Sequence, residues 1–125
     1  MGDFKKLKVW RKAHAFSLNT YRAVDRIRGA QHVSLRSQTI RAALSIPANI
    51  VEGNGYRSHR EFRRFLGYSV NSANEVEYHL TVASDLGLIP KTQCRSLVND
   101  LEEIRKMIYG LIKYLSQDDE EEKDS

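Results

Sequence analysis

The chain lacks the features that mark secreted and membrane-spanning proteins. Its 125 residues include a single cysteine, Cys94, so no disulfide can form within the chain. No apolar run approaches the roughly 18 residues that a transmembrane helix needs. Residues 1–6 also lack the apolar stretch of a secretory signal. These absences predict a cytoplasmic protein with no membrane partner.

Proline and glycine are scarce, and their positions divide the chain into helical segments. Apolar residues recur every three or four positions over about residues 8–28, 35–52, 58–86 and 91–115. No segment has the alternating pattern of a convincing strand. Short connections and one apolar stripe per helix predict an all-α fold, an antiparallel up-down four-helix bundle formed by residues 1–117. Pro47 lies inside the second helix, where the loss of a backbone donor predicts a kink.

The stretch between the second and third helices combines stop and start signals. Gly53 and Gly55 are expected to end the second helix by adopting positive φ. Ser58 followed by Glu61 is typical of a capping box, which starts the third helix. The apolar residues that follow are expected to enter the core: Phe62, Phe65 and Leu66.

Positive charge is concentrated outside the C-terminal residues. Residues 118–125 contain six acidic residues and one lysine, a net charge of −5. The net charge of the whole chain is +4, so residues 1–117 carry +9. A basic body of this kind attracts polyanions. The acidic tail, 118–125, is expected to be disordered, and it either aids solubility or competes for the basic surface.

The densest basic cluster opens the third helix: Arg57, Arg60, Arg63 and Arg64. The last three share one helix face, so their guanidinium groups could engage consecutive phosphates. The alternative is a solvated face that is paired with carboxylates, including those of a neighbouring subunit. Tyr56 lies beside these arginines and is a candidate to stack on a base.

A second basic cluster surrounds Trp10 near the N-terminus. Its members are Lys5, Lys6, Lys8, Arg11 and Lys12. Trp10 could stack on a base, but its place on the apolar stripe favours packing into the core or a subunit interface. The candidate nucleic-acid-binding residues from these two regions are Tyr56, Arg57, Arg60, Arg63, Arg64, Lys5, Lys8, Arg11 and Lys12.

Catalytic and cofactor sites find little support in the sequence. The glycines around Asn54 follow a helix and lack the lysine of a phosphate-binding loop. A di-iron bundle needs two Glu-x-x-His pairs, which are absent. His59 and Glu61 could in principle act as acid and base on bound RNA, but Glu61 is already expected to cap the helix. We therefore expect no cofactor, no metal and no small-molecule substrate.

Several motifs resemble those of a known family. They are Phe-x-x-Leu-x-Val-Trp at 4–10, Ser-Ile-Pro-x-Asn-Ile-x-Glu-Gly at 45–53, Arg-Ser-x-x-Glu-Phe-x-x-Phe-Leu at 57–66, and Ser-x-x-Glu at 72–75. The chain resembles the four-helix-bundle proteins encoded in intervening sequences of bacterial 23S rRNA genes. The resemblance implies a homo-oligomer, a ring of five, with a basic surface and no established catalytic activity. It also implies a fold similar to the nucleic-acid-binding accessory proteins of diversity-generating retroelements.

The sequence thus predicts a non-enzymatic, oligomeric bundle that binds structured RNA or a ribonucleoprotein through its basic surface. An oligomeric scaffold whose arginines serve protein partners, with no nucleic-acid role, is the alternative.

Overall fold

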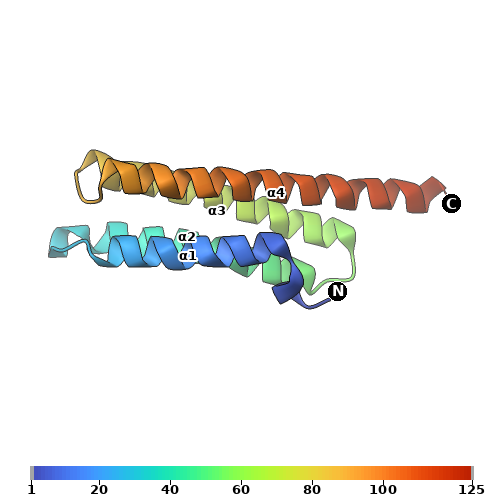
Figure 1. Cartoon of the computed structure of the whole chain (residues 1–125). Coiled ribbons are helices and arrows are strands. Elements are labelled where there is room, and N and C mark those ends of the chain that lie inside the picture. The colour runs from blue at the N-terminus through green and yellow to red at the C-terminus, as the bar shows by residue number, and fades with distance from the viewer. Residues whose placement is uncertain (1, 125) are drawn as a thin grey trace.

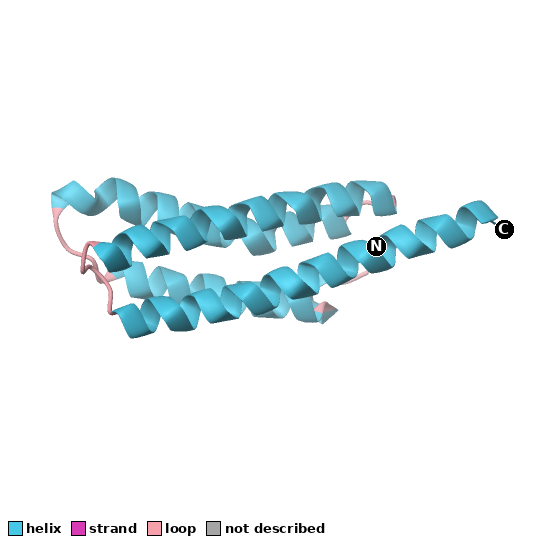
Figure 2. Cartoon of the chain, turned by 90° about the horizontal axis from the view of Figure 1, so that it is seen from above, coloured by secondary structure: helices cyan, strands magenta, loops and turns pink. Residues whose placement is uncertain are grey.

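The computed structural model describes the backbone of residues 2–124 and the side chains of residues 2–117. Four long helices form the molecule: α1 (Lys8–Asp25), α2 (Val33–Asn54), α3 (His59–Asp85) and α4 (Lys91–Asp124). Two short 3-10 helices, η1 (Phe4–Lys6) and η2 (Ala30–His32), precede α1 and α2. None of the described residues is in a strand, so the all-α prediction is confirmed. Consecutive helices run in opposite directions along one axis (Figures 1 and 2).

The helix boundaries differ from the predicted ones mainly at the C-terminus. The last helix continues to Asp124, beyond the predicted end at Leu115. No glycine or proline occurs after Gly110, and the glutamates of this stretch are good helix formers, so no local signal ends the helix. The disorder expected for residues 118–125 stays a prediction, and the side chains of these residues lie outside the described part of the chain.

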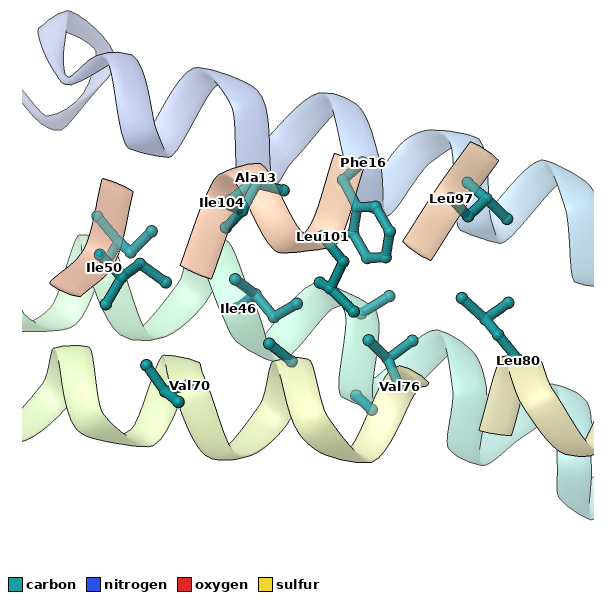
Figure 3. Packing of buried hydrophobic residues seen from close by; sticks show 14 of the residues in the cluster. Ala13, Phe16, Ile46, Ile50, Val70, Val76, Leu80, Leu97, Leu101 and Ile104 are labelled. Atoms are coloured by element: carbon teal, nitrogen blue, oxygen red, sulfur yellow. The ribbon is translucent and has the colours of Figure 1, made fainter. Parts of the chain in front are cut away.

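The core runs along the bundle axis and draws on every helix. Figure 3 shows Phe16 of α1, Ile46 and Ile50 of α2, and Leu101 and Ile104 of α4 converging on it. Phe62, Leu66, Val76 and Leu80 supply the α3 face, and all four are at most 3% exposed. Such an apolar stripe, buried at helical spacing, provides most of the stability of a bundle.

Pro47 is accommodated inside α2 by a hydroxyl from α1. A proline at position 47 cannot donate the usual hydrogen bond to the carbonyl of Ala43. The buried Ser17 hydroxyl lies 2.7 Å from that carbonyl oxygen and 2.9 Å from that of Ala13, and can donate to either. The α2 helix continues through Pro47 to Asn54, and the kink expected there stays a prediction.

The two helices α2 and α3 pack closely because of Gly53. A Cβ atom at Gly53 would lie 2.8 Å from Cβ of Phe65 and 3.0 Å from Cδ1 of Phe62. Gly53 lies within α2, and neither it nor Gly55 has positive φ. The expectation that these glycines end the helix through a left-handed conformation was therefore wrong. Gly53 is needed for close approach of two helices rather than for a turn.

Hydroxyl groups add polar contacts along the same seam. The Ser72 hydroxyl donates to Oγ of Ser45 at 2.9 Å, and Asn49 Nδ2 donates to the Ser45 carbonyl at 2.8 Å. The Ser69 hydroxyl donates to the carbonyl of Ile46 at 2.9 Å. The Ser-Ile-Pro-x-Asn and Ser-x-x-Glu motifs thus contain residues that join α2 to α3.

At its N-terminal end α3 has the expected Ser58 cap, and a glycine turn forms its C-terminal end. The Ser58 hydroxyl accepts from the backbone N–H of Glu61 at 3.3 Å, as an N-cap should. At the other end Gly87 has φ +73°, and the N–H of Leu88 bonds the carbonyl of Ala83 at 2.9 Å. This is a Schellman motif, which ends the helix and turns the chain toward α4.

Candidate nucleic-acid interface

The structure brings the two predicted basic clusters to the same end of the bundle. We call this region, made of residues 2–12 and 52–64, the basic end. The N-terminal ends of α1 and α3 both lie there (Figure 1). Nδ2 of Asn54, at the end of α2, donates to the carbonyl of Gly2 at 2.6 Å and ties the two segments together. The basic end contains nine lysines and arginines and three acidic residues, Asp3, Glu52 and Glu61.

The two clusters are about 45 residues apart in the sequence, although one signal predicts that they meet. In an up-down bundle the first and third helices run parallel, so their N-terminal ends meet at one end. Positive helix-dipole ends therefore coincide with the positive side chains.

Within the N-terminal segment, three of the predicted lysines face solvent and Arg11 has a structural role. Lys5, Lys8 and Lys12 are exposed. Arg11 Nη1 lies 3.2 Å from the Lys5 carbonyl and 3.1 Å from the Lys6 carbonyl, so it holds η1 against the start of α1. Its guanidinium is exposed, but these carbonyls already use part of its donor capacity.

Trp10 packs within the protein, as its apolar position favoured. Its indole stacks on the His14 ring, with centroids 4.9 Å apart and planes 7° apart. The Phe4 ring meets the indole edge-on at 4.9 Å. Trp10 is half-buried against the core, and both rings that it contacts lie close to it in the sequence. It is therefore a poor candidate for base stacking.

The four arginines of the cluster that opens α3 are not equivalent. Arg63 is half-buried, and its Nη1 donates to the carbonyl of Leu115 at 3.2 Å, which joins α3 to α4. Arg64 is half-exposed and pairs with Glu61, whose Oε2 lies 2.7 Å from Nη2. The hydrogen bond to Glu61, and then the one to Tyr68, raise the pKa of Arg64. Arg57 and Arg60 are exposed.

An aromatic–arginine stack, made of Tyr56, Phe65, Tyr68 and Arg64, lies beside these arginines. The Tyr56 and Phe65 rings stack with centroids 5.4 Å apart and planes 16° apart. Tyr68 meets Phe65 edge-on, also at 5.4 Å. The prediction that Phe65 enters the core was wrong, because its ring is outside the buried cluster and packs between two exposed tyrosines. Phe65 and Tyr68 were missed as site residues, although a helix period places Arg64 beside Tyr68 at i, i+4.

The opposite seam of the bundle, between α1 and α4, is less tightly filled. A cavity of about 190 Å³ lies there, lined by Lys12, Ala15, Phe16, Asn19, Asp100, Glu103 and Ile104. A second cavity of about 260 Å³ adjoins it and shares Asn19 and Asp100. Its lining adds Arg22, Arg26, Gln93 and Ser96, which are polar and charged. Both are open to solvent, and their mixed charges favour no particular ligand.

Groups that could support metal or acid–base chemistry are dispersed. Among the described side chains, no three histidine, cysteine or carboxylate groups gather around a common point. The Glu61 carboxylate, considered as an acid or base with His59, is engaged by Arg64. None of the described helices has an apolar stretch long enough to cross a bilayer.

Comparisons with known proteins agree with the fold. Residues 5–110 match the family described as 23S rRNA-intervening sequence protein. A solved structure from Bacteroides thetaiotaomicron, a protein of unknown function from the S23 ribosomal protein family, is similar, with 29% sequence identity and a TM-score of 0.78. The match covers 84% of this chain and 98% of that one. No curated protein matches the chain.

Proposed function

The chain belongs to the 23S rRNA-intervening sequence protein family, and we propose that its basic end binds the phosphate backbone of structured RNA or of an RNA–protein complex. The observation that carries this proposal is the meeting of two basic segments, distant in sequence, at one end of the bundle. Binding rather than catalysis is proposed, in the cytoplasm and without a cofactor.

Charge geometry supports a polyanion as the ligand. Five cationic side chains of the basic end are exposed: Arg57, Arg60, Lys5, Lys8 and Lys12. They lie where the N-termini of two helices add positive potential. Among the described side chains, neither Arg57 nor Arg60 has an ion-pair partner. Cations that no described carboxylate neutralises are available to displace counterions from phosphates. Affinity should then fall steeply as salt rises.

Self-association is the second part of the proposal. Ser17 of α1 bonds to Ala43 of α2, and the residues that follow each of them, Leu18 and Leu44, are 38% and 43% exposed. Tyr21 on α1 is 45% exposed. Apolar side chains on adjoining helices favour contact with a second copy. We propose a homo-oligomer, with five subunits as the family resemblance implies, and native mass spectrometry measures the number directly.

The alternative, an oligomeric scaffold without a nucleic-acid role, makes a different electrostatic prediction. In that case Arg57 and Arg60 would form ion pairs with carboxylates of a neighbouring subunit. Replacing them would then weaken the oligomer and leave RNA affinity unaffected.

The test is a salt titration of RNA binding with charge-matched variants. Arg57→Ala/Arg60→Ala should lower affinity for an rRNA fragment and reduce the slope of log K against log salt by roughly 0.7–0.9 for each phosphate that the variant no longer binds. Arg22→Ala/Arg26→Ala removes the same charge from exposed positions at the other end of α1, where Arg26 is the C-cap residue, and is the control. Equal slope changes in the two variants would overturn the site assignment, because they would show an effect of net charge alone.

A further inference from the structure

We propose that the aromatic–arginine stack of Tyr56, Phe65, Tyr68 and Arg64 binds unpaired bases, so that the preferred ligand is RNA with a single-stranded loop or end. This inference rests on the proposed RNA-binding function and adds the substrate class. Backbone contacts at the basic end would accept any RNA helix. The stack would select RNA in which bases are free to leave their own strand.

The stack presents an exposed aromatic surface. Tyr56 and Tyr68 are 38% and 41% exposed, and Phe65 between them is only half-buried. The two tyrosine rings each contact Phe65 outside the core and leave apolar faces in water, which folding alone does not require. The Tyr56 and Phe65 rings are nearly parallel, and a base that stacks on the outer face of Tyr56 would extend this arrangement by one ring. Base–aromatic stacking tolerates any sequence because every base has a π-face.

The stack is held in place before a ligand arrives. Arg64 Nη1 donates to the Tyr68 hydroxyl at 3.0 Å, while its Nη2 donates to Glu61 at 2.7 Å. The guanidinium carbon lies 4.9 Å from the centre of the Phe65 ring and 5.6 Å from that of Tyr68. These contacts limit the rotamers of the side chains, so less conformational entropy is lost on binding.

The stack lies beside groups that can bind phosphate. Arg57 directly follows Tyr56 in the turn before α3, and Arg60 lies one helical turn before Arg64. A base stacked on Tyr56 would therefore have its own phosphate close to exposed cations. An aromatic surface could also receive a protein segment, but the excess of cations over acids at the basic end favours a polyanion.

The experiment compares two RNAs of equal length and charge, a hairpin with an unpaired loop and a fully paired duplex. Affinities are measured by fluorescence anisotropy at one salt concentration, with 2-aminopurine in the loop to report stacking. Tyr56→Ala should weaken loop binding by roughly 5- to 100-fold. It should leave duplex affinity and the salt slope unchanged, because no charge is removed. Tyr56→Phe keeps the ring and should keep the affinity.

Tyr78→Ala is the matched control, since Tyr78 is also on α3 and is 66% exposed. It should bind both RNAs as the unmodified protein does, and thermal melts verify that each variant is folded. Equal losses for loop and duplex in Tyr56→Ala, or no loss for the loop, would overturn the inference while leaving the proposed function intact. If the unmodified protein binds neither RNA at low salt, the proposed function fails, and this inference fails with it.

Discussion

Replacing Gly53 with alanine should destabilise the bundle, although alanine is the better helix former. Gly53 lies within α2, where the change to alanine alone is worth about 0.5–1 kcal/mol in favour of the variant. The added methyl group would lie 2.8 Å from Cβ of Phe65 and 3.3 Å from the carbonyl oxygen of Phe62. Ordinary carbon contacts are at about 3.5–4.0 Å. Neither atom can move without its backbone, so α2 and α3 must separate locally.

The expected magnitude follows from these two opposed effects. Overpacking of a well-filled contact costs about 1–3 kcal/mol, and a clash with backbone-fixed atoms belongs near the upper end. The net loss should be about 1–2 kcal/mol. For a domain of this size, a loss of 1 kcal/mol lowers Tm by roughly 3–6 °C.

Gly110→Ala is the matched control for this prediction. Gly110 is exposed within α4, and a Cβ atom there would meet nothing within 4 Å. The same substitution should therefore stabilise the protein by about 0.5–1 kcal/mol. Urea unfolding and thermal melts are run at one protein concentration, because oligomer formation would make Tm depend on it. If the Gly53→Ala variant is as stable as the unmodified protein, Gly53 is not required for the close approach of α2 and α3.

Three further outcomes are expected. Ser58→Ala removes the N-cap of α3 and should lower stability by about 1 kcal/mol, measured by thermal melts; an unchanged Tm would show that the cap contributes nothing. Ser17→Ala leaves the buried Ala43 carbonyl without its donor and should cost about 1–3 kcal/mol in urea unfolding. In a Pro47→Ala background the restored N–H should reduce that cost, and equal costs in both backgrounds would contradict the role given to Ser17. Truncation after Gln117 removes a net charge of −5 and should raise RNA affinity at low salt, an effect that must vanish at high salt if it is electrostatic.

Local signals predicted the helices well and the long-range contacts poorly. Periodicity alone identified all four helices, and the Ser58 cap was readable from the sequence because a cap is a local arrangement. Gly53 was misread since a glycine that ends a helix and one that permits close packing look alike until the neighbouring helix is placed. The fold could therefore be predicted more reliably than the structural role of each glycine.

The sequence predicted which residue types form the candidate site but not what each of these residues contacts. Charge density found the arginines, yet it could not show that Arg63 bonds to the end of α4 while Arg60 faces solvent. Phe65 lies at the edge of the apolar face of α3, where a helical wheel assigns it to the core. Its contact with Tyr56 comes from a turn, whose path has no periodicity to read.

The unequal seams of the bundle imply unequal local stability. The α2–α3 seam has close backbone approach and buried hydroxyl bonds, whereas two pockets that are open to solvent lie along the α1–α4 seam. Transient opening should therefore release α1 and α4 first, and their amide protons should exchange with deuterium before those of the α2–α3 hairpin. The basic end spans both parts, because Lys8, Arg11 and Lys12 lie on α1 whereas Arg60, Arg63 and Arg64 lie on α3. An RNA bound to both helices would hold the bundle closed. It would therefore slow amide exchange along α1, including positions that are distant from the bound bases.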